Sequence, residues 1–117
     1  MESITSDASS EAIIAAVAKQ FKKDPSVDGI VCASTTAAMA AVVGVQQSGR
    51  QIGHEVDLTA KEAIPFLQAF RSNILTVFEN VAEAGDQLAK AIIRSIDHPE
   101  LPPIQALDVP DMIKKPR

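Results

Sequence analysis

The feature that most constrains the fold is a short apolar run that leads directly into a polar elbow and an alanine-rich stretch. Residues 29–33 read GIVCA, and Ser34-Thr35-Thr36 follows at once. A continuous apolar run is typical of a strand buried on both faces of a parallel sheet. Thr35 or Thr36 is expected to cap a helix from about 36 to 47, with Gly49 just past its end. The segment therefore predicts a β-α unit with hydroxyl groups at the carboxyl end of the strand.

The remaining chain alternates between helical and extended patterns. Ser9 or Ser10 can cap a first helix, and Asp24-Pro25 ends it. Asn80 and Glu83 have the spacing of a capping box at the start of a long helix. The predicted elements are helices over about 10–23, 36–47 and 80–97 and strands over 29–33, 56–59, 74–78 and 104–109. This order predicts an α/β fold, with a parallel sheet and flanking helices.

Composition and charge exclude several classes of function. The 117 residues carry a net charge of −4, the wrong sign for binding phosphates, and aromatic residues make up only 3%. The single cysteine, Cys32, excludes an internal disulfide and suits a reducing compartment. No apolar run approaches the roughly 18 residues of a membrane span, and the first residues do not resemble a secretion signal. We therefore expect a cytoplasmic protein with no membrane partner.

No pattern for catalysis or cofactor binding stands out in the sequence. His54 and His98 lie far apart, without cysteine or histidine companions at metal-ligand spacing. There is no glycine-rich phosphate loop, and no plausible Ser-His-acid or paired-carboxylate arrangement can be named. We therefore expect no enzyme, no cofactor and no metal site.

Polar residues at the ends of the predicted strands are the candidate ligand contacts. In open parallel sheets, ligands bind beyond the carboxyl ends of the strands. Ser34 and Thr35 lie at such an end, and the loop after Thr59 carries Lys61 and Glu62. Helix capping is the alternative role for the two hydroxyl residues, and a solvated loop acid is the alternative for Glu62.

Residues 29–96, from "GIVCASTTAAMAAVVGVQQSG" through "VDLTAKEA" and "ILTVFENVAEAGDQLAKAIIRSI", resemble the second half of the effector-binding core of the lac-repressor (LacI/GalR) family of bacterial transcriptional regulators. The similarity is spread over many weak positions between about 9 and 110. It implies part of a two-lobed, periplasmic-binding-protein-like (type I) fold. Residues 1–78 would belong to the C-terminal lobe, 79–109 to the N-terminal lobe and 110–117 to a tail.

The resemblance also implies roles for single residues. Ser34 and Thr35 stand where the family has Asn-Asp, and Glu62 stands at the first acid of an aromatic-Asp-Asp motif. Glu79 stands at a glutamine where the chain crosses between lobes. Ligand contacts are thus expected at Ser34, Thr35, Glu62 and Glu79. The effector, sugar-like or nucleoside-like, would bind in the full-length protein, and operator DNA would bind only through an N-terminal domain that this sequence lacks.

Departures from the family pattern alter the expected ligand. Lys61 replaces the aromatic residue of the motif, and Ala63 replaces the second acid. Because half of the cleft is also missing, we expect this chain alone not to bind simple sugars measurably. Two other functions stay open at this point: part of a periplasmic-type solute-binding protein, and a stand-alone α/β scaffolding domain.

A homodimer or larger homo-oligomer is expected, because several large apolar residues have no place in the core of the predicted helices and strands. Three large apolar residues lie in a predicted loop, where solvation disfavours them unless something covers them. Core burial is one explanation for them, and the resemblance implies a two-fold interface. The expected interface residues are Met39, Val43, Phe66, Leu67 and Phe70. Val81, Leu88 and Ile92 would face the other lobe of an intact core, so we expect them to be bare in this chain.

Overall fold

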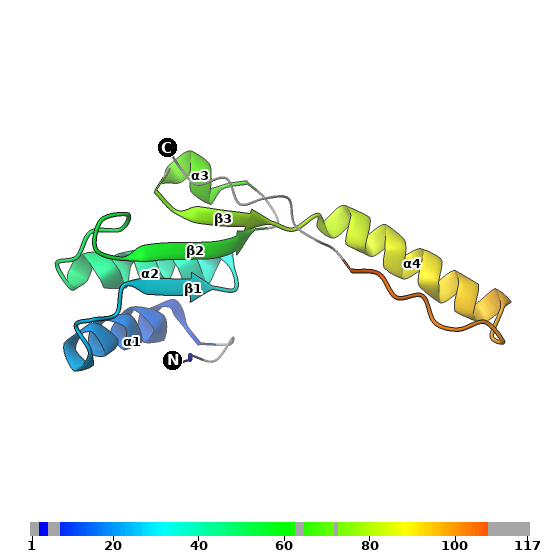
Figure 1. The fold of residues 1–117 in the computed structure, drawn as a ribbon, viewed down its shortest axis with the longest axis horizontal. Helices are drawn as coiled ribbons and strands as arrows, with labels where there is room; N and C mark the ends of the chain where they lie inside the picture. Colours follow the sequence, from blue (N-terminus) through cyan, green and yellow to red (C-terminus); the bar gives the residue numbers. More distant parts are fainter. Residues whose placement is uncertain (1–2, 5–7, 63–64, 72, 108–117) are drawn as a thin grey trace.

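The computed structural model describes residues 3–4, 8–62, 65–71 and 73–107 of the chain. It contains a three-stranded parallel sheet in the order β1-β2-β3, with neighbouring strands paired in register (Figure 1). The elements are α1 (Ser10–Lys23), β1 (Gly29–Cys32), α2 (Thr35–Gln47), β2 (Asp57–Glu62), α3 (Leu67–Phe70), β3 (Leu75–Phe78) and α4 (Val81–Asp97). The prediction of a parallel α/β sheet with flanking helices is confirmed.

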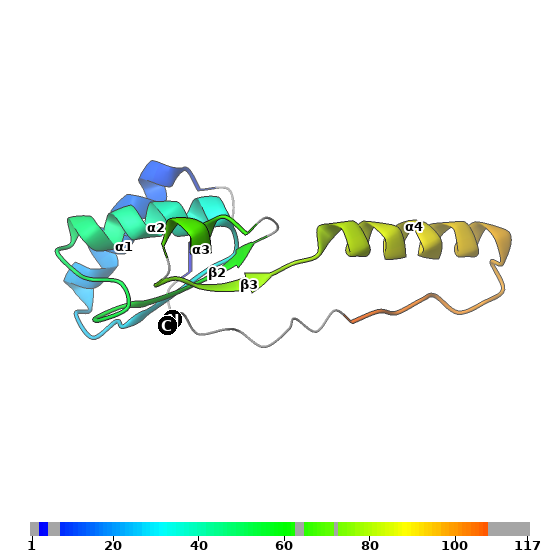
Figure 2. The ribbon, with the colours of Figure 1, turned by 90° about the horizontal axis from the view of Figure 1, so that it is seen from above.

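One face of the sheet carries the helices and the core. Figure 2 shows α1, α2 and α3 on the same side of the strands. Leu58 and Ala60 of β2 and Cys32 of β1 point to that side and are buried. They pack with Val17 and Phe21 of α1 and with the inner residues of α2: Ala38, Ala41, Val42 and Val45. Aromatic residues are scarce, so the core consists largely of alanine and valine. These small side chains allow the helices to approach the sheet closely.

The other face of the sheet is bare over the part of the chain that the structure describes. Val31 in the middle of β1 is 87% exposed. Strand register places Thr59 and Leu75 beside it, with Lys61 and Val77 in the next row. The prediction that the first strand is buried on both faces is therefore wrong. An apolar strand can be buried on both faces, but its sequence does not show whether another element covers each face. No described element covers this one.

The boundaries of two predicted elements differ from the sequence-based ones. Ser34, rather than Thr35 or Thr36, is the N-cap of α2, because its Oγ accepts a hydrogen bond from the Ala37 amide at 3.2 Å. The second strand begins at Asp57 and continues to Glu62, so it contains the residues that the sequence placed in a loop. This longer strand brings Lys61 and Glu62 into the ladder with β3.

Helix α4 extends away from the sheet instead of packing on it. Its N-terminus is capped by Asn80, whose Oδ1 accepts a hydrogen bond from the Glu83 amide at 3.1 Å, as the sequence predicted. None of its 17 residues is buried. Residues 98–107 run back beside it in Figure 1, and residues 101–107 form no strand. The predicted strand at 104–109 is therefore wrong over 104–107, while residues 108 and 109 lie outside the described part.

The α4 surface matches the expectation that its apolar side would be bare. Val81 is 53% exposed, Leu88 65% and Ile92 60%. Lys90 lies on the opposite, polar side and pairs with Asp86 at 2.6 Å. The helix is therefore amphipathic, with its apolar stripe directed at solvent.

The buried thiol of Cys32 gives a first testable prediction. Burial raises its pKa to about 11, from a usual value of 9.0. At pH 8 the thiolate fraction, and with it the reaction rate, should be about 100-fold below that of the same thiol in the unfolded chain. Reaction with a chromogenic disulfide reagent, with and without denaturant, measures this ratio. Equal rates in the two states would show that the core around Cys32 is open.

The same shift fixes a direction for stability against pH. A thiol whose pKa is raised by folding favours the folded state fully below its unfolded pKa. This contribution is lost as pH rises from about 9 to about 11. Replacing Cys32 by alanine should remove the part of the alkaline destabilisation that falls in this window.

Candidate functional site

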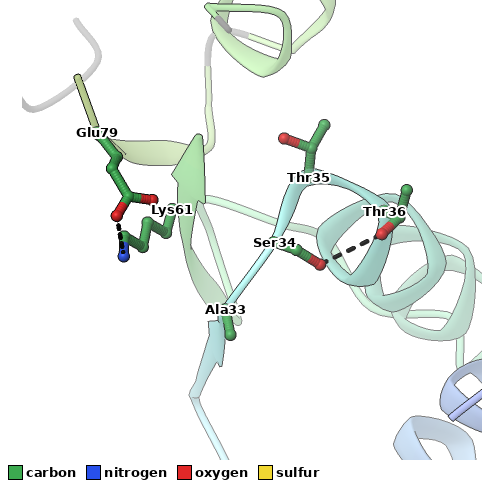
Figure 3. A pocket seen from close by; sticks show the side chains of 6 residues that line it. All are labelled: Ala33, Ser34, Thr35, Thr36, Lys61 and Glu79. Carbon is green, nitrogen blue, oxygen red and sulfur yellow. Dashed lines mark hydrogen bonds and ion pairs between the residues drawn. The ribbon is translucent and has the colours of Figure 1, made fainter. Parts of the chain in front are cut away.

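A pocket lies at the carboxyl ends of the strands, where β1 runs into α2 and β2 meets the end of β3. Its volume is about 280 Å³, and its lining residues are Ala33, Ser34, Thr35, Thr36, Lys61 and Glu79. Figure 3 shows the hydroxyl residues of the elbow on one side and Lys61 with Glu79 on the other. Polar groups were expected at this edge because the strands were predicted to be parallel, and the strands of the structure are parallel.

The hydroxyl side of the pocket is built by the first turn of α2. Ser34 Oγ accepts the Ala37 amide and lies 3.2 Å from Thr36 Oγ1. Thr35 is half-buried and lies between these two hydroxyl residues in sequence. The first turn of α2 holds no acidic residue. This wall therefore offers hydroxyl donors and acceptors beside the positive end of a helix dipole.

The charged side of the pocket is an ion pair across two strand ends. Lys61 Nζ lies 2.8 Å from Glu79 Oε1, and the two side chains are 51% and 38% exposed. The Glu79 amide donates to the Glu62 carbonyl at 2.7 Å, which carries the β2–β3 ladder one bond past Phe78. An exposed pair of this kind contributes about 1 kcal/mol or less to stability. Its two groups are therefore available to a ligand at little structural cost.

Glu62 has a structural role that the sequence did not predict. Its side chain is 2% exposed, and its Oε1 accepts hydrogen bonds from the Phe66 amide at 3.1 Å and the Leu67 amide at 2.6 Å. The interpretation of Glu62 as a solvated loop acid is therefore wrong. It holds the start of α3 and is not among the residues that line the pocket.

Three of the four expected ligand contacts, Ser34, Thr35 and Glu79, are thus brought together, and two further residues join them. Thr36 and Lys61 line the pocket as well, although the resemblance implied no ligand contact for either of them. Two features of the sequence could have identified Lys61 as a lining residue: its charge is opposite to that of Glu79, and it lies at the end of a strand. The signal for Thr36 was its place in the same hydroxyl elbow as Ser34.

The apolar residues expected at an interface divide into two groups. Met39 and Val43 of α2 are 42% and 39% exposed, while Phe66 and Phe70 are 42% and 69% exposed. The rings of Phe66 and Phe70 stack with centroids 5.5 Å apart. Leu67 is only 2% exposed and belongs to the core, so its assignment to an interface is wrong. It occupies the inward position of α3, where a contact with a second chain would bury no further area.

Two features are absent from the residues that the structure describes. Among them, no group of three or more histidine, cysteine or acidic side chains could hold a metal ion. Within the same ranges, no helix combines the length and apolar character needed to cross a membrane. The polar side chains that line the pocket carry three hydroxyl groups, one ammonium and one carboxylate.

The chain forms an α/β domain with a pocket at the carboxyl edge of a parallel sheet. Two solved structures are similar to it in fold. A LacI family transcriptional regulator from Arthrobacter sp. FB24, in complex with lactose, matches 93% of this chain with a TM-score of 0.70 and 16% identity. A second structure of a LacI family regulator from the same organism matches 81% of the chain with a TM-score of 0.65 and 19% identity.

These matches cover 42% and 35% of the two regulators, so the chain spans less than half of their length. No protein-family model matches the sequence, and no curated protein matches it. The likeness therefore confirms the predicted fold, that of the periplasmic-binding-protein-like effector domain of LacI regulators.

Proposed function

We propose that this chain is the second half of the effector-sensing core of a LacI-type transcriptional regulator. The observation that carries the proposal is the polar pocket at the carboxyl ends of the strands, in a fold shared with a regulator that binds lactose. The chain itself senses a small molecule and performs no catalysis. A cytoplasmic location goes with this role.

The division into lobes forms part of this proposal. Residues 1–78 belong to the C-terminal lobe, residues 79–109 belong to the N-terminal lobe, and residues 110–117 are a tail. The separation of α4 from the sheet supports the boundary at Glu79, since α4 buries none of its residues in the sheet's core. DNA is bound through a separate helix-turn-helix domain, and the net charge of −4 suits a sensing part that does not itself touch DNA.

The ligand class follows from the groups in the pocket. Hydroxyl, ammonium and carboxylate groups hydrogen-bond to the hydroxyl groups of a sugar or a nucleoside. None of the described residues that line the pocket is aromatic, so none can stack on a sugar ring. One wall alone also buries only part of a ligand's surface. We therefore assign the effector contact to Ser34, Thr35, Thr36, Lys61 and Glu79, with weak affinity in this chain alone.

An NMR-detected titration with pentoses, hexoses, disaccharides and nucleosides tests the proposal. The expected result is binding in the millimolar range or weaker, with amide shifts confined to residues 33–36, 61 and 79. Calorimetry at micromolar protein should register no heat of binding. Micromolar affinity for a simple sugar, or shifts centred elsewhere in the domain, would contradict the assignment.

Association through the exposed phenylalanines is the second part of the proposal. Phe70 is 69% exposed and stacks on Phe66, so the two rings present one apolar surface at α3. Met39 and Val43 belong to α2, which lies on the same side of the sheet as α3 (Figure 2). These four residues form a homo-oligomer contact in the proposed assembly.

Replacing Phe70 by aspartate should weaken this contact. The variant would bury an unpaired carboxylate in an apolar interface, which costs about 3 kcal/mol or more. Sedimentation equilibrium at tens of micromolar should show a lower average mass for Phe70→Asp than for the parent chain. Lys19→Asp, at an exposed position of α1 outside the four contact residues, serves as the control and should leave the mass unchanged. An indifferent Phe70→Asp variant would show that the rings do not take part in association.

A further inference from the structure

The carboxyl end of β2 presents two charged residues to opposite sides of the sheet. Lys61 is exposed and lines the pocket, whereas Glu62 is buried on the side that carries the helices. Successive residues of a strand alternate between the two faces of a sheet, so a single peptide unit joins the pocket to the helix layer. A displacement of the backbone at this point therefore moves both side chains.

On the pocket side, two contacts hold Glu79 to β2. Its side chain pairs with Lys61 Nζ at 2.8 Å (Figure 3), and its amide donates to the Glu62 carbonyl at 2.7 Å. Together with the peptide between Lys61 and Glu62, these contacts form a closed ring that joins the ends of β2 and β3. The ion pair therefore supports the last hydrogen bond between the two strands, at an end where a ladder opens most easily.

On the helix side, the same Glu62 fixes the start of α3. Its Oε1 accepts the Phe66 amide at 3.1 Å and the Leu67 amide at 2.6 Å, and the bond to Leu67 is buried. The turn of α3 is closed by the Phe70 amide, which donates to the Phe66 carbonyl at 3.1 Å. A helix of only four residues is marginal without further contacts. Glu62 therefore sets the position of α3 and of the two stacked rings that α3 carries.

Helix α3 can accordingly be held or released, and the two states differ in its contact with Glu62. In the held state, the carboxylate accepts both amides, and the rings of Phe66 and Phe70 stack with centroids 5.5 Å apart. In the released state, both bonds are lost and the rings no longer present one surface. Because hydrogen bonds weaken steeply with misalignment, a backbone displacement at the end of β2 favours release. Contacts that fix this strand end favour the held state.

We propose that occupation of the pocket strengthens association through Phe66 and Phe70, with the Lys61–Glu79 ion pair and the positioning residue Glu62 as the connection. This inference rests on the proposed function, because it joins the ligand site of that proposal to its association contact. A ligand that bridges the hydroxyl residues 34–36 and Glu79 ties the carboxyl ends of β1, β2 and β3 together. The tie stabilises the hold of Glu62 on α3.

Hydrogen exchange of the Leu67 amide tests the connection without any ligand. Lys61→Ala removes the ion pair, and Leu67 exchange should become about two- to fivefold faster, the range that the strength of exposed ion pairs allows. Gly53 is the internal reference, because its amide donates to the Val56 carbonyl at 2.9 Å near the other end of β2. Its exchange rate should not change. Lys90→Ala, which breaks an exposed ion pair within α4, should change neither rate.

A double variant separates this connection from a general loss of stability. Glu79→Ala breaks the same ion pair from the other strand and should accelerate Leu67 exchange by the same factor as Lys61→Ala. Combining the two substitutions should add no further acceleration, because the pair is already broken. Equal Leu67 rates in Lys61→Ala and in the parent chain would overturn the proposal. Equal acceleration of the Leu67 and Gly53 amides would overturn it too.

Ribose, glucose, maltose and adenosine are the ligand probes, each added until the amide shifts of residues 33–36 no longer change. A probe that produces these shifts should slow Leu67 exchange about fivefold or more and leave Gly53 unchanged. Because coupling is reciprocal, it should also lower the dissociation constant of the homo-oligomer in sedimentation equilibrium.

The outcomes distinguish this inference from the proposed function. Pocket shifts without slower exchange at Leu67 would overturn the coupling and leave the ligand site standing. Absence of pocket shifts with all four probes would contradict the proposed function instead, while the Lys61→Ala result still decides whether the pocket is connected to α3.

Discussion

Replacing Gly44 by alanine should destabilise the domain by about 2 kcal/mol, although alanine is the better helix former. Gly44 lies in α2 where that helix crosses α1. A Cβ atom there would stand 2.8 Å from Val17 Cβ, 3.0 Å from Val17 Cγ1 and 3.1 Å from the Ile14 carbonyl oxygen. Neither a β-branched side chain nor a backbone carbonyl can move aside without shifting α1. The added methyl group must therefore separate the two helices that cover the sheet.

The same substitution at Gly85 is the matched control. A Cβ atom at Gly85, in the second turn of α4, meets no atom within 4 Å. Gly85→Ala should therefore stabilise α4 by up to about 1 kcal/mol, through helix propensity alone. Thermal unfolding followed by circular dichroism should show a lower Tm for Gly44→Ala and an unchanged or higher Tm for Gly85→Ala. Equal effects of the two substitutions would contradict the close packing of α1 on α2.

Replacing Glu62 by alanine should cost about 3 kcal/mol, because a buried acceptor disappears and its donors remain. The carboxylate accepts the Phe66 and Leu67 amides, and the second of these bonds is buried. Both amides lie at the start of α3, so their loss should also release Leu67 and Phe70 from their positions. Hydrogen exchange of the Leu67 amide should become faster in the variant, in addition to the loss of overall stability.

Two comparisons separate this effect from a loss of charge. Glu62→Gln keeps an acceptor oxygen and should retain most of the stability. Glu79→Ala removes a carboxylate from an exposed ion pair and should cost about 1 kcal/mol or less. Chemical denaturation of all three variants gives the order. If Glu62→Ala is no worse than Glu79→Ala, the carboxylate does not hold the start of α3.

The parallel sheet could be predicted from the sequence because its pattern is local. Two short apolar runs, Gly29 to Cys32 and the residues of β3, have the length and composition of strands. Helical patterns separate them. The N-cap of α4 could also be predicted, because Asn80 and Glu83 have the spacing of a capping box. The bare sheet face was not predictable in this way. A covered and an uncovered Val31 have the same neighbours in sequence.

The position of the candidate site could be predicted from the sequence, but the roles of some of its residues could not. Ser34 and Thr35 had to lie at the carboxyl edge once the strand order was parallel. Glu62 was misread because its partners are backbone amides four and five residues further on, and a backbone amide leaves no mark in a sequence. Lys61 was placed at this edge by the sequence but was given no contact role, because the loop predicted there fixes no partner for its charge. Its partner Glu79 follows a different strand, so only the register of β2 with β3 brings them together.

The most direct test of the account asks whether Lys61 contacts the ligand. Lys61→Ala and Lys90→Ala form a matched pair, since each lysine is largely exposed and lies within 2.8 Å of a carboxylate, but only Lys61 lines the pocket. NMR titration with the sugar or nucleoside that binds the parent chain best should show at least tenfold weaker affinity for Lys61→Ala. Lys90→Ala should bind as the parent does. Equal affinities for the two variants would contradict the claim that this pocket is the effector site.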